Sequence, residues 1–544
     1  MSHAPRLPMI ALVPSLLTLA TAVTGAAGSV LSLSNVIAVA GQQVPGQAPG
    51  VTYGTLANNP SISSSGIVAW GGALAGVPAV NNQAAFVATS SSNVTIAGQS
   101  GTAAPGGPAG ATLDLNGGSN GFQTNSVRIN GSGTVSFVSL MTGGGTVPNT
   151  NNWGVFAGPA NGSLSMIARS GQQVQGAAPG TNTGSTFATG VPVIGNTVYF
   201  GSSTVGGDTV TGTNNSVITR STSNAFTTLV RQGSASPAGG NYASVSNPTL
   251  QANASGQVLF TASPALYRYD PVTGVTVLHA TGQAAPGTAG ATYGGAAQVF
   301  SANFNNQGQA LFTSTLTGGD VSGTTNNTGV FITGSSGTSL LWRNGSAAPG
   351  IAGGTFLSTN SIGYMLSNSG SVALPASLVQ GGSITAANDS GIWLGGAGSL
   401  SLVVREGDAV PTLNATFGAL GNVNISVNAL DQLVFTSTMV SSDTNLNNKS
   451  ALFAYTSATG VFPIAYAGES LEVTPGVFKT ISSFGIARGH NADGGSLGFS
   501  DTGVLAVRVT FSDTTSAIVS YVVPSPSVIA LGALAVPFAM RRRR

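Results

Sequence analysis

The side chains best suited to chemistry are few, because charged residues make up only 6% of this 544-residue chain. Histidine and carboxylates cluster once, in the segment RGHNADGGSLGFSD, which contains His490, Asp493 and Asp501. A histidine beside carboxylates can serve as a general base or bind a metal ion. The same residues are equally typical of turns in a glycine-rich loop. We therefore assign no catalytic residue and no metal ligand, and regard this segment as the first place to look for either.

A second candidate is a set of arginines that recur two residues before a glycine in a repeated phrase. A ring of guanidinium groups could bind an acidic polysaccharide through paired hydrogen bonds. The alternative is that each arginine binds carbonyl oxygens or an aspartate of the neighbouring repeat. The candidate ligand ring consists of Arg169, Arg231, Arg343 and Arg405.

Three aspartates, Asp208, Asp320 and Asp443, each precede an Asn-Asn pair in a polar loop such as GGDVSGTTNN. Oxygen ligands of this kind suit Ca²⁺, which takes six to eight of them. The alternative is that these residues form Asx turns. No cofactor is expected apart from this candidate for Ca²⁺.

The phrase that carries the arginines recurs through the whole body of the chain, for example as ARSGQQVQGAAPG at Ala168 and WRNGSAAPGIAG at Trp342. Its glycines run from Gly41 to Gly468 in seven steps that average 61 residues. The step from Gly233 to Gly282 is the shortest, at 49 residues. Self-similarity on this scale indicates a propeller or a solenoid.

Two further phrases describe the strands of each repeat. NASGQVLF from Asn253 and NNQGQALF from Asn305 show a tight turn that leads into an alternating strand. NNTGVF at Asn326 adds a turn and a second short strand. In the sixth repeat we expect strands at residues 339–343, 355–365, 371–379 and 391–394. Four short strands per repeat predict an all-β fold, a β-propeller of about eight four-stranded blades. An open β-solenoid or a string of sandwiches is the alternative.

The N-terminus predicts a signal peptide over residues 1–27. Arg6 precedes an apolar run and then small residues suited to cleavage. A retained membrane helix is the alternative. The propeller is expected over residues 36–523, followed by a sorting or anchor segment over residues 524–544.

In that last segment a short apolar stretch is followed by an anchor stop of four arginines, Arg541, Arg542, Arg543 and Arg544. Basic residues after an apolar helix stay on the cytoplasmic side of the membrane. The segment resembles the PEP-CTERM sorting signal of Gram-negative bacteria, in which a Pro-Glu-Pro motif precedes such a helix. Pro524, Ser525 and Pro526 match it, with Ser525 where the family usually has Glu. The resemblance implies processing by exosortase, and a plain C-terminal membrane anchor is the alternative.

The repeats resemble a family of bacterial surface proteins with choice-of-anchor tandem NxxGxxAF repeats. The copies that start at Asn130, Asn253 and Asn305 match its spacing, with Ser or Leu in place of Ala. The likeness covers nearly the whole mature chain. It implies a cell-surface location and no established enzymatic activity.

Charge and cysteine content exclude several classes of function. Removing Arg6 and the four terminal arginines from the 16 basic residues leaves 11, against 14 acidic residues. The mature chain therefore lacks the excess of Lys and Arg that nucleic-acid binding requires. Without any cysteine it has no thiol nucleophile and no Cys-ligated metal site.

The sequence thus predicts an exported cell-surface or extracellular-matrix protein that is not an enzyme and that binds glycan or protein. Its expected partners are the Sec translocon, an exosortase-like processing enzyme and extracellular polysaccharide, with the inner membrane as a transient location. The alternative is a propeller-type polysaccharide hydrolase or lyase. The eight repeats contain only 14 acidic residues between them, and this small number favours the non-enzymatic interpretation.

Overall fold

The computed structural model describes residues 35–524 with ten internal gaps. The gaps are Ala57, residues 116–126, 185–191, 223–224 and 246–249, Pro264, residues 300–302, 358–362 and 490–494, and Ser496. The predicted signal and anchor helices lie outside the described residues. Within these residues, no helix has the length and the apolar character needed to cross a membrane.

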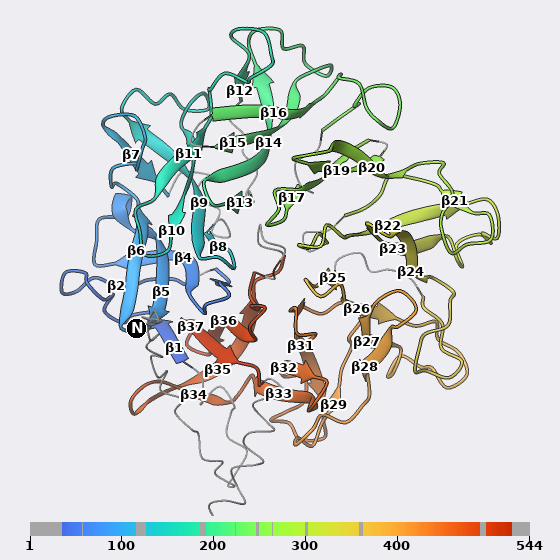
Figure 1. Cartoon of the computed structure of the whole chain (residues 1–544). Coiled ribbons are helices and arrows are strands. Elements are labelled where there is room, and N and C mark those ends of the chain that lie inside the picture. The colour runs from blue at the N-terminus through green and yellow to red at the C-terminus, as the bar shows by residue number, and fades with distance from the viewer. Residues whose placement is uncertain are drawn as a thin grey trace, which may run out of the picture.

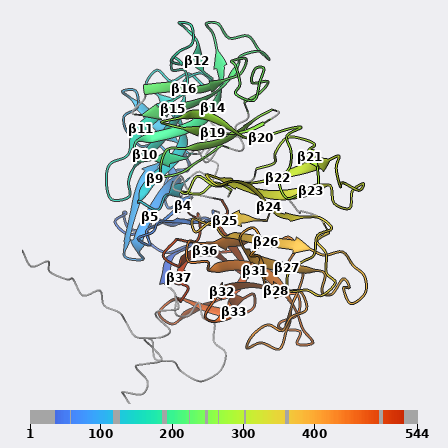
Figure 2. The same ribbon diagram turned by 45° about the vertical axis from the view of Figure 1, so that its right-hand side comes forward.

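The described residues form eight antiparallel sheets around a common centre (Figure 1). Turned by 45°, the sheets of successive blades stack face to face (Figure 2). One short 3₁₀ helix, Ala79–Asn81, is the only helix among the described residues. The prediction of an all-β propeller with about eight blades is confirmed.

Blade 1 consists of β2 (Thr52–Tyr53), β3 (Ser61–Ile62), β4 (Val68–Ala75), β5 (Gln83–Ser90) and β6 (Asn93–Gln99), and blade 2 of β7 (Ala111–Asp114), β8 (Arg128–Ile129), β9 (Thr134–Gly143), β10 (Trp153–Pro159) and β11 (Ser165–Arg169). Blade 3 consists of β12 (Asn182–Thr183), β13 (Val193–Ile194), β14 (Thr197–Val205), β15 (Ser216–Thr222) and β16 (Ala225–Arg231). Blade 4 consists of β17 (Gln251–Ala252), β18 (Val258–Ala262), β19 (Ala265–Asp270) and β20 (Gly274–Ala280).

Blade 5 consists of β21 (Thr292–Tyr293), β22 (Ala310–Thr317), β23 (Thr328–Gly334) and β24 (Gly337–Arg343), and blade 6 of β25 (Met365–Leu366), β26 (Val372–Ser377), β27 (Ser390–Gly395) and β28 (Ser401–Arg405). Blade 7 consists of β29 (Thr416–Phe417), β30 (Ile425–Val427), β31 (Leu433–Val440), β32 (Ser450–Thr456) and β33 (Gly460–Tyr466). Blade 8 consists of β34 (Ser470–Thr474), β35 (Val477–Ile486), β36 (Val504–Phe511) and β37 (Ser516–Val522), and is completed by β1 (Asn35–Val39).

The two ends of the described chain close the ring together. β1 pairs antiparallel with β37, with Val39 opposite Ala517, and so forms the outer strand of blade 8. The blade therefore combines strands from both ends of the chain. Pairing of β1 covers the edge of β37, which would otherwise present unpaired backbone groups.

The sequence repeat is offset from the structural blade by one strand. The strand expected at residues 339–343 is β24, which completes blade 5 and does not open blade 6. The long strand expected at residues 355–365 is wrong. That segment includes an isolated bridge from Phe356 to Leu378, and the paired strand β25 starts only at Met365. The repeat phrases run from one outer strand to the next, whereas a blade runs from its inner strand outward.

The large apolar residue that ends each turn-and-strand phrase has a fixed partner. Phe312 on β22 lies opposite Phe331 on β23, with stacked rings whose centroids are 5.5 Å apart. Both side chains are completely buried. Blades 1, 2, 4 and 7 repeat this stacked pair as Trp70–Phe86, Phe137–Phe156, Phe260–Tyr267 and Phe435–Phe453. Each pair stabilises the sheet by about 0.5–1.5 kcal/mol beyond the burial of its area.

The asparagine that opens the same phrase links one blade to the next. Asn305 Oδ1 accepts a hydrogen bond from Gln309 N at 3.0 Å, and Asn305 Nδ2 donates to the backbone oxygen of Ser367 in blade 6 at 2.9 Å. The same cross-blade bond runs from Asn130 to Val193, from Asn253 to Asn305 and from Asn428 to Ser500. The turns of neighbouring blades are therefore joined side by side.

Candidate functional site

The four arginines of the predicted ring hold loops of their own blades. Each lies at the end of an outer strand, β11, β16, β24 or β28. In each case Nε donates to the backbone oxygen of an asparagine that precedes the strand paired with that outer strand. These asparagines are Asn151, Asn214, Asn326 and Asn388. The repetition of the arginine position is real. The partner loop, however, belongs to the same blade and not to the neighbouring one that the alternative expected.

Two of the aspartates considered for Ca²⁺ are ion-paired with these arginines. Asp208 receives two bonds from Arg231, of 2.8 and 2.9 Å, and Asp320 lies 2.7 Å from Arg343. The guanidinium of Arg231, and then the hydroxyl of Thr181, hold the pKa of Asp208 well below its usual range. Asp443 accepts from the backbone of Asn445 at 2.9 Å, which is an Asx turn. Among the described residues no three His, Cys, Asp or Glu side chains come together as a metal site.

The histidine–carboxylate segment is described only in part. His490 and Asp493 lie outside the described residues. Asp501 accepts from Ala429 N and from Asn368 Nδ2, both at 2.8 Å. It therefore joins the turns of blades 6, 7 and 8.

The start of this segment does reach a cavity at the middle of the propeller. The cavity has a volume of about 290 Å³, and we call it the axial pocket. Its lining comes from the innermost parts of blades 7, 8, 1 and 2, the region where β8 lies in Figure 1. The lining residues are Asn59, Ser61, Val127, Arg128, Asn424, Ile486, Ala487, Arg488 and Leu497.

Hydrogen bonds between blades hold the walls of the axial pocket in place. Ser61 Oγ accepts from Ile129 N at 2.9 Å, which joins blade 1 to blade 2. Asn59 Nδ2 donates to the backbone oxygen of Ile486 at 3.1 Å, which joins blade 1 to blade 8. The pocket is thus built where the first and last blades of the ring meet.

The electrostatic character of the axial pocket is cationic. Burial lowers the pKa of Arg128 to about 10, and burial also lowers the pKa of Arg488 and of the neighbouring Arg508. Arg488 and Arg508 each also have an interaction partner within the protein.

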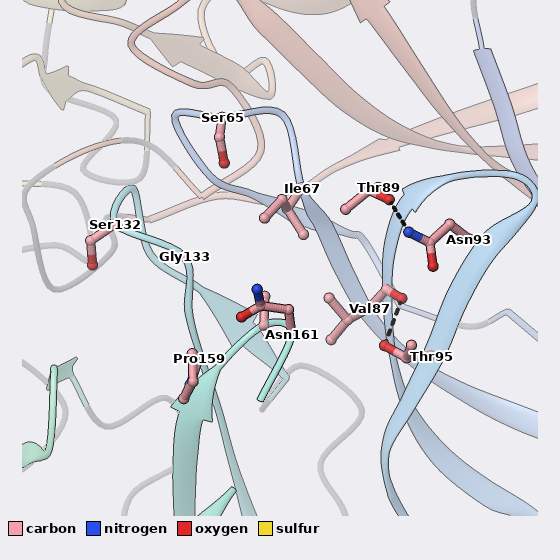
Figure 3. Close-up of a pocket in the computed structure, with 11 residues that line it drawn as sticks. Ser65, Ile67, Val87, Thr89, Asn93, Thr95, Ser132, Gly133, Pro159 and Asn161 are labelled. Atoms are coloured by element: carbon pink, nitrogen blue, oxygen red, sulfur yellow. Dashed lines mark hydrogen bonds between the residues drawn. The ribbon is translucent and has the colours of Figure 1, made fainter. Parts of the chain in front are cut away.

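A second hollow lies between blades 1 and 2 and has a volume of about 260 Å³. Figure 3 shows side chains of Ser65, Thr89, Asn93 and Asn161 around it. Asn93 Nδ2 donates to Thr89 Oγ1 at 2.8 Å. The described lining of this groove carries no charge, so it lacks the feature that distinguishes the axial pocket.

Two buried titratable groups escaped the sequence-based prediction. His279 on β20 is completely buried, lies 3.1 Å from Ser314 Oγ and packs on Tyr293 with ring centroids 4.3 Å apart. Burial lowers its pKa to about 4. Glu406 accepts from Ser390 Oγ at 2.5 Å, and its pKa is raised, first by burial and also by Asp389. Neither residue lines the axial pocket.

Of the predicted sorting motif, only Pro524 is described. Its backbone oxygen accepts from Gln432 Nε2 at 3.1 Å. Ser525, Pro526 and the four terminal arginines lie outside the described residues, so processing stays a prediction.

Sequence comparison finds one family. The model of DUF7453, a family of unknown function, matches residues 22–270 and again residues 263–530. Each match spans about four blades, and together the two matches cover nearly the whole chain. No curated protein matches the chain.

Solved structures with a similar fold have very low sequence identity. An α-L-arabinofuranosidase from Fusarium graminearum is 10% identical, with a TM-score of 0.26, and the match covers 78% of this chain and 98% of that one. A PL25 ulvan lyase bound to -[GlcA(1-4)Rha3S]- is 10% identical, with a TM-score of 0.31 and coverage of 90% and 94%. A Trypanosoma rangeli sialidase with sialic acid is 11% identical, with a TM-score of 0.23 and coverage of 80% and 62%.

The prediction that the chain is not an enzyme needs correction. These structural neighbours are a glycoside hydrolase, a polysaccharide lyase and a sialidase. At about 10% identity and with TM-scores of 0.23 to 0.31, the likeness assigns no reaction to this chain.

Proposed function

The chain belongs to DUF7453, a family of unknown function, and we propose that it is an exported propeller that acts on extracellular polysaccharide held in the axial pocket. The observation that carries this proposal is the pocket itself. Polar side chains from blades 1, 2, 7 and 8 converge on one cavity of about 290 Å³. A concave site with a few convergent polar groups is the usual form of a ligand site.

Of the two reaction classes, hydrolysis and elimination, the lining favours the lyase. Hydrolysis of a glycosidic bond generally uses a pair of carboxyl groups, and the described lining residues include no Asp or Glu. Arg128 and Arg488 are suited instead to stabilising negative charge that develops during an elimination.

Export and sorting belong to the same proposal. The apolar N-terminal run after Arg6 and the basic C-terminal tail support secretion by the general route, followed by release at the Pro524–Pro526 motif. The test is mass spectrometry of the extracellular protein. Release predicts a mature form that lacks the residues after Pro526, and an intact tail on that form would contradict it.

Activity can be tested with the purified full-length chain and a panel of acidic and neutral polysaccharides. We expect new reducing ends together with the ultraviolet absorbance of unsaturated sugar ends, which only elimination produces. Reducing ends without that absorbance would identify a hydrolase. If the chain neither binds nor shortens any polymer in the panel, the proposed function is contradicted.

A further inference from the structure

The buried histidine His279 lies at the contact between two blades. It stands on β20, the outer strand of blade 4. Its ring packs on β21 and β22 of blade 5, where the ring centroids of Tyr293 and Phe312 are 4.3 and 5.2 Å from its own. Ser314 Oγ, also on β22, lies 3.1 Å from His279 Nε2. We call these four residues the His279 interface.

Glycine or an apolar residue takes the same position in the other seven blades. His279 lies opposite Leu266, at the register shift between the two outermost strands of blade 4. This position directly precedes the one that carries the rim arginines, which are Arg169, Arg231, Arg343 and Arg405. Its equivalents in the other blades are Gly98, Ala168, Val230, Trp342, Val404, Ala465 and Ala38. Blade 4 therefore differs from the rest by a titratable group at this contact.

The His279 interface suits a neutral imidazole and not a charged one. An imidazolium donates from both ring nitrogens, but Nδ1 of His279 is buried without a hydrogen-bond partner. Burial lowers the pKa of His279 to about 4, and only the backbone of the residue itself opposes this effect. The titratable side chain that faces the ring is Tyr293, and burial raises its pKa, so it stays uncharged. A protonated His279 therefore gains stability only where its ring reaches water.

Hydrogen bonds at the inner edge hold the same two blades together. Asn253 Nδ2 donates to the backbone oxygen of Asn305 at 3.0 Å, and Asn303 N donates to Gln251 Oε1 at 2.9 Å. Amide groups form both bonds, so acid does not remove them. Separation of blades 4 and 5 would therefore start at the outer edge, at β20 and β21. The strands β1 and β37, which close the propeller, lie across the ring from this place (Figure 1).

We propose that the His279 interface is an acid-sensitive hinge: when His279 takes up a proton, blades 4 and 5 separate at their outer edge while the inner bonds and the other blades stay in place. This inference goes beyond the proposed function, because it concerns the response of the fold to pH and needs no ligand.

The test is hydrogen–deuterium exchange of the full-length chain and of His279→Phe, each at pH 7.5 and at pH 5. Comparing the two proteins at one pH cancels the effect of pH on the chemistry of exchange. For amides of β20 and β21, we expect the ratio of the parent's exchange rate to that of the variant to rise about 30-fold between pH 7.5 and 5. The reason is that a histidine released to water recovers its ordinary pKa and takes up the proton. Amides of β31 and β32 in blade 7 are the control, and their ratio should stay constant.

Two results would overturn the hinge. One is a constant ratio in β20 and β21. The other is an equal rise in β31 and β32, because acid would then weaken the whole fold and not one contact. His279→Val, which introduces the residue that blades 3 and 6 carry at this position, is the second variant in case His279→Phe does not fold. Thermal unfolding at pH 7.5 checks both variants. Either result would leave the proposed function untouched, since the measurement involves no polysaccharide.

Discussion

The arginines of this chain differ in the partners of their guanidinium groups. Arg231 and Arg343 end outer strands and bind an aspartate and a carbonyl oxygen of their own blades. Arg128 has an unpaired Nε at the axial pocket. Spacing in the sequence reveals the first set because it recurs with the repeat. It does not reveal the second, since Arg128 lies outside the repeated phrase and its surroundings come from Asn59 and from residues more than 350 positions later in the chain.

Replacing a rim arginine should affect folding more than binding. Arg343→Gln removes the donor to Asn326 and the ion pair with Asp320, and we expect a loss of about 1–3 kcal/mol in the free energy of unfolding. Urea unfolding measures this loss. Arg169→Gln, at a more exposed position, is the matched control and should cost less. Unchanged stability together with weaker polysaccharide binding would show that Arg343 is a ligand residue after all.

His279 should make stability depend on pH. Its folded-state pKa of about 4 lies below the usual 6.5, so the unfolded chain binds the proton more readily. The contribution of the neutral His279 to the free energy of unfolding is complete above pH 6.5 and is lost as the pH falls towards 4. Between pH 7.5 and 5 it amounts to about 2 kcal/mol.

The variant His279→Phe tests this contribution, since Tyr293 and Phe312 already pack on the ring. The free energy of unfolding, measured by urea at a series of pH values, should fall by about 2 kcal/mol less in the variant than in the parent between pH 7.5 and 5. Identical slopes for the two proteins would show that His279 is not the group responsible.

The turn-and-strand phrase is the element that the sequence predicts best. Asn and Gly at its start indicate a tight turn, and Gly308 indeed has a φ of +70°. Blade 7 keeps this conformation with Asp431, at a φ of 56°. The bond from the asparagine to the next blade could not be predicted, because it depends on how the blades stand relative to each other. The split of the strand expected at residues 355–365 was missed for the same reason.

Graded substitutions of Asn305 separate the two tasks of the asparagine. Asn305→Ser can keep the turn bond, as Ser367 Oγ does by accepting from Ser371 N at 3.1 Å, but it cannot reach the next blade. Asn305→Ala loses both bonds. We expect the free energy of unfolding to fall by about 1 kcal/mol for Ser and by about 2–3 kcal/mol for Ala. Equal losses in chemical denaturation would mean that the bond to the next blade contributes nothing.

On the scale of the whole molecule, the number of repeats predicts the number of blades, whereas the closure of the ring required the structure. β1 completes blade 8, so the first strand of the described chain and the last one pair with each other. The axial pocket forms beside this junction, with lining from blades 7, 8, 1 and 2. Its position follows from ring closure, which no local pattern encodes.

Removal of β1 tests the importance of closure. A chain that lacks residues 1–40 exposes the edge of β37, and we expect a lower unfolding temperature and association of the protein through that edge. A chain that lacks residues 1–34 keeps β1 and is the control. Thermal unfolding with light scattering distinguishes the two. A monomer with unchanged unfolding temperature after the longer deletion would show that β1 is dispensable.

The central claim is that a polysaccharide binds in the axial pocket, and a crystal structure of the full-length chain with an oligosaccharide from the polymer that it acts on tests this claim most directly. The account predicts a sugar unit within the axial pocket, in contact with polar residues that line it, such as Ser61 and Asn424. An oligosaccharide bound instead at the rim arginines or in the groove of Figure 3, with the axial pocket holding only water, would contradict it.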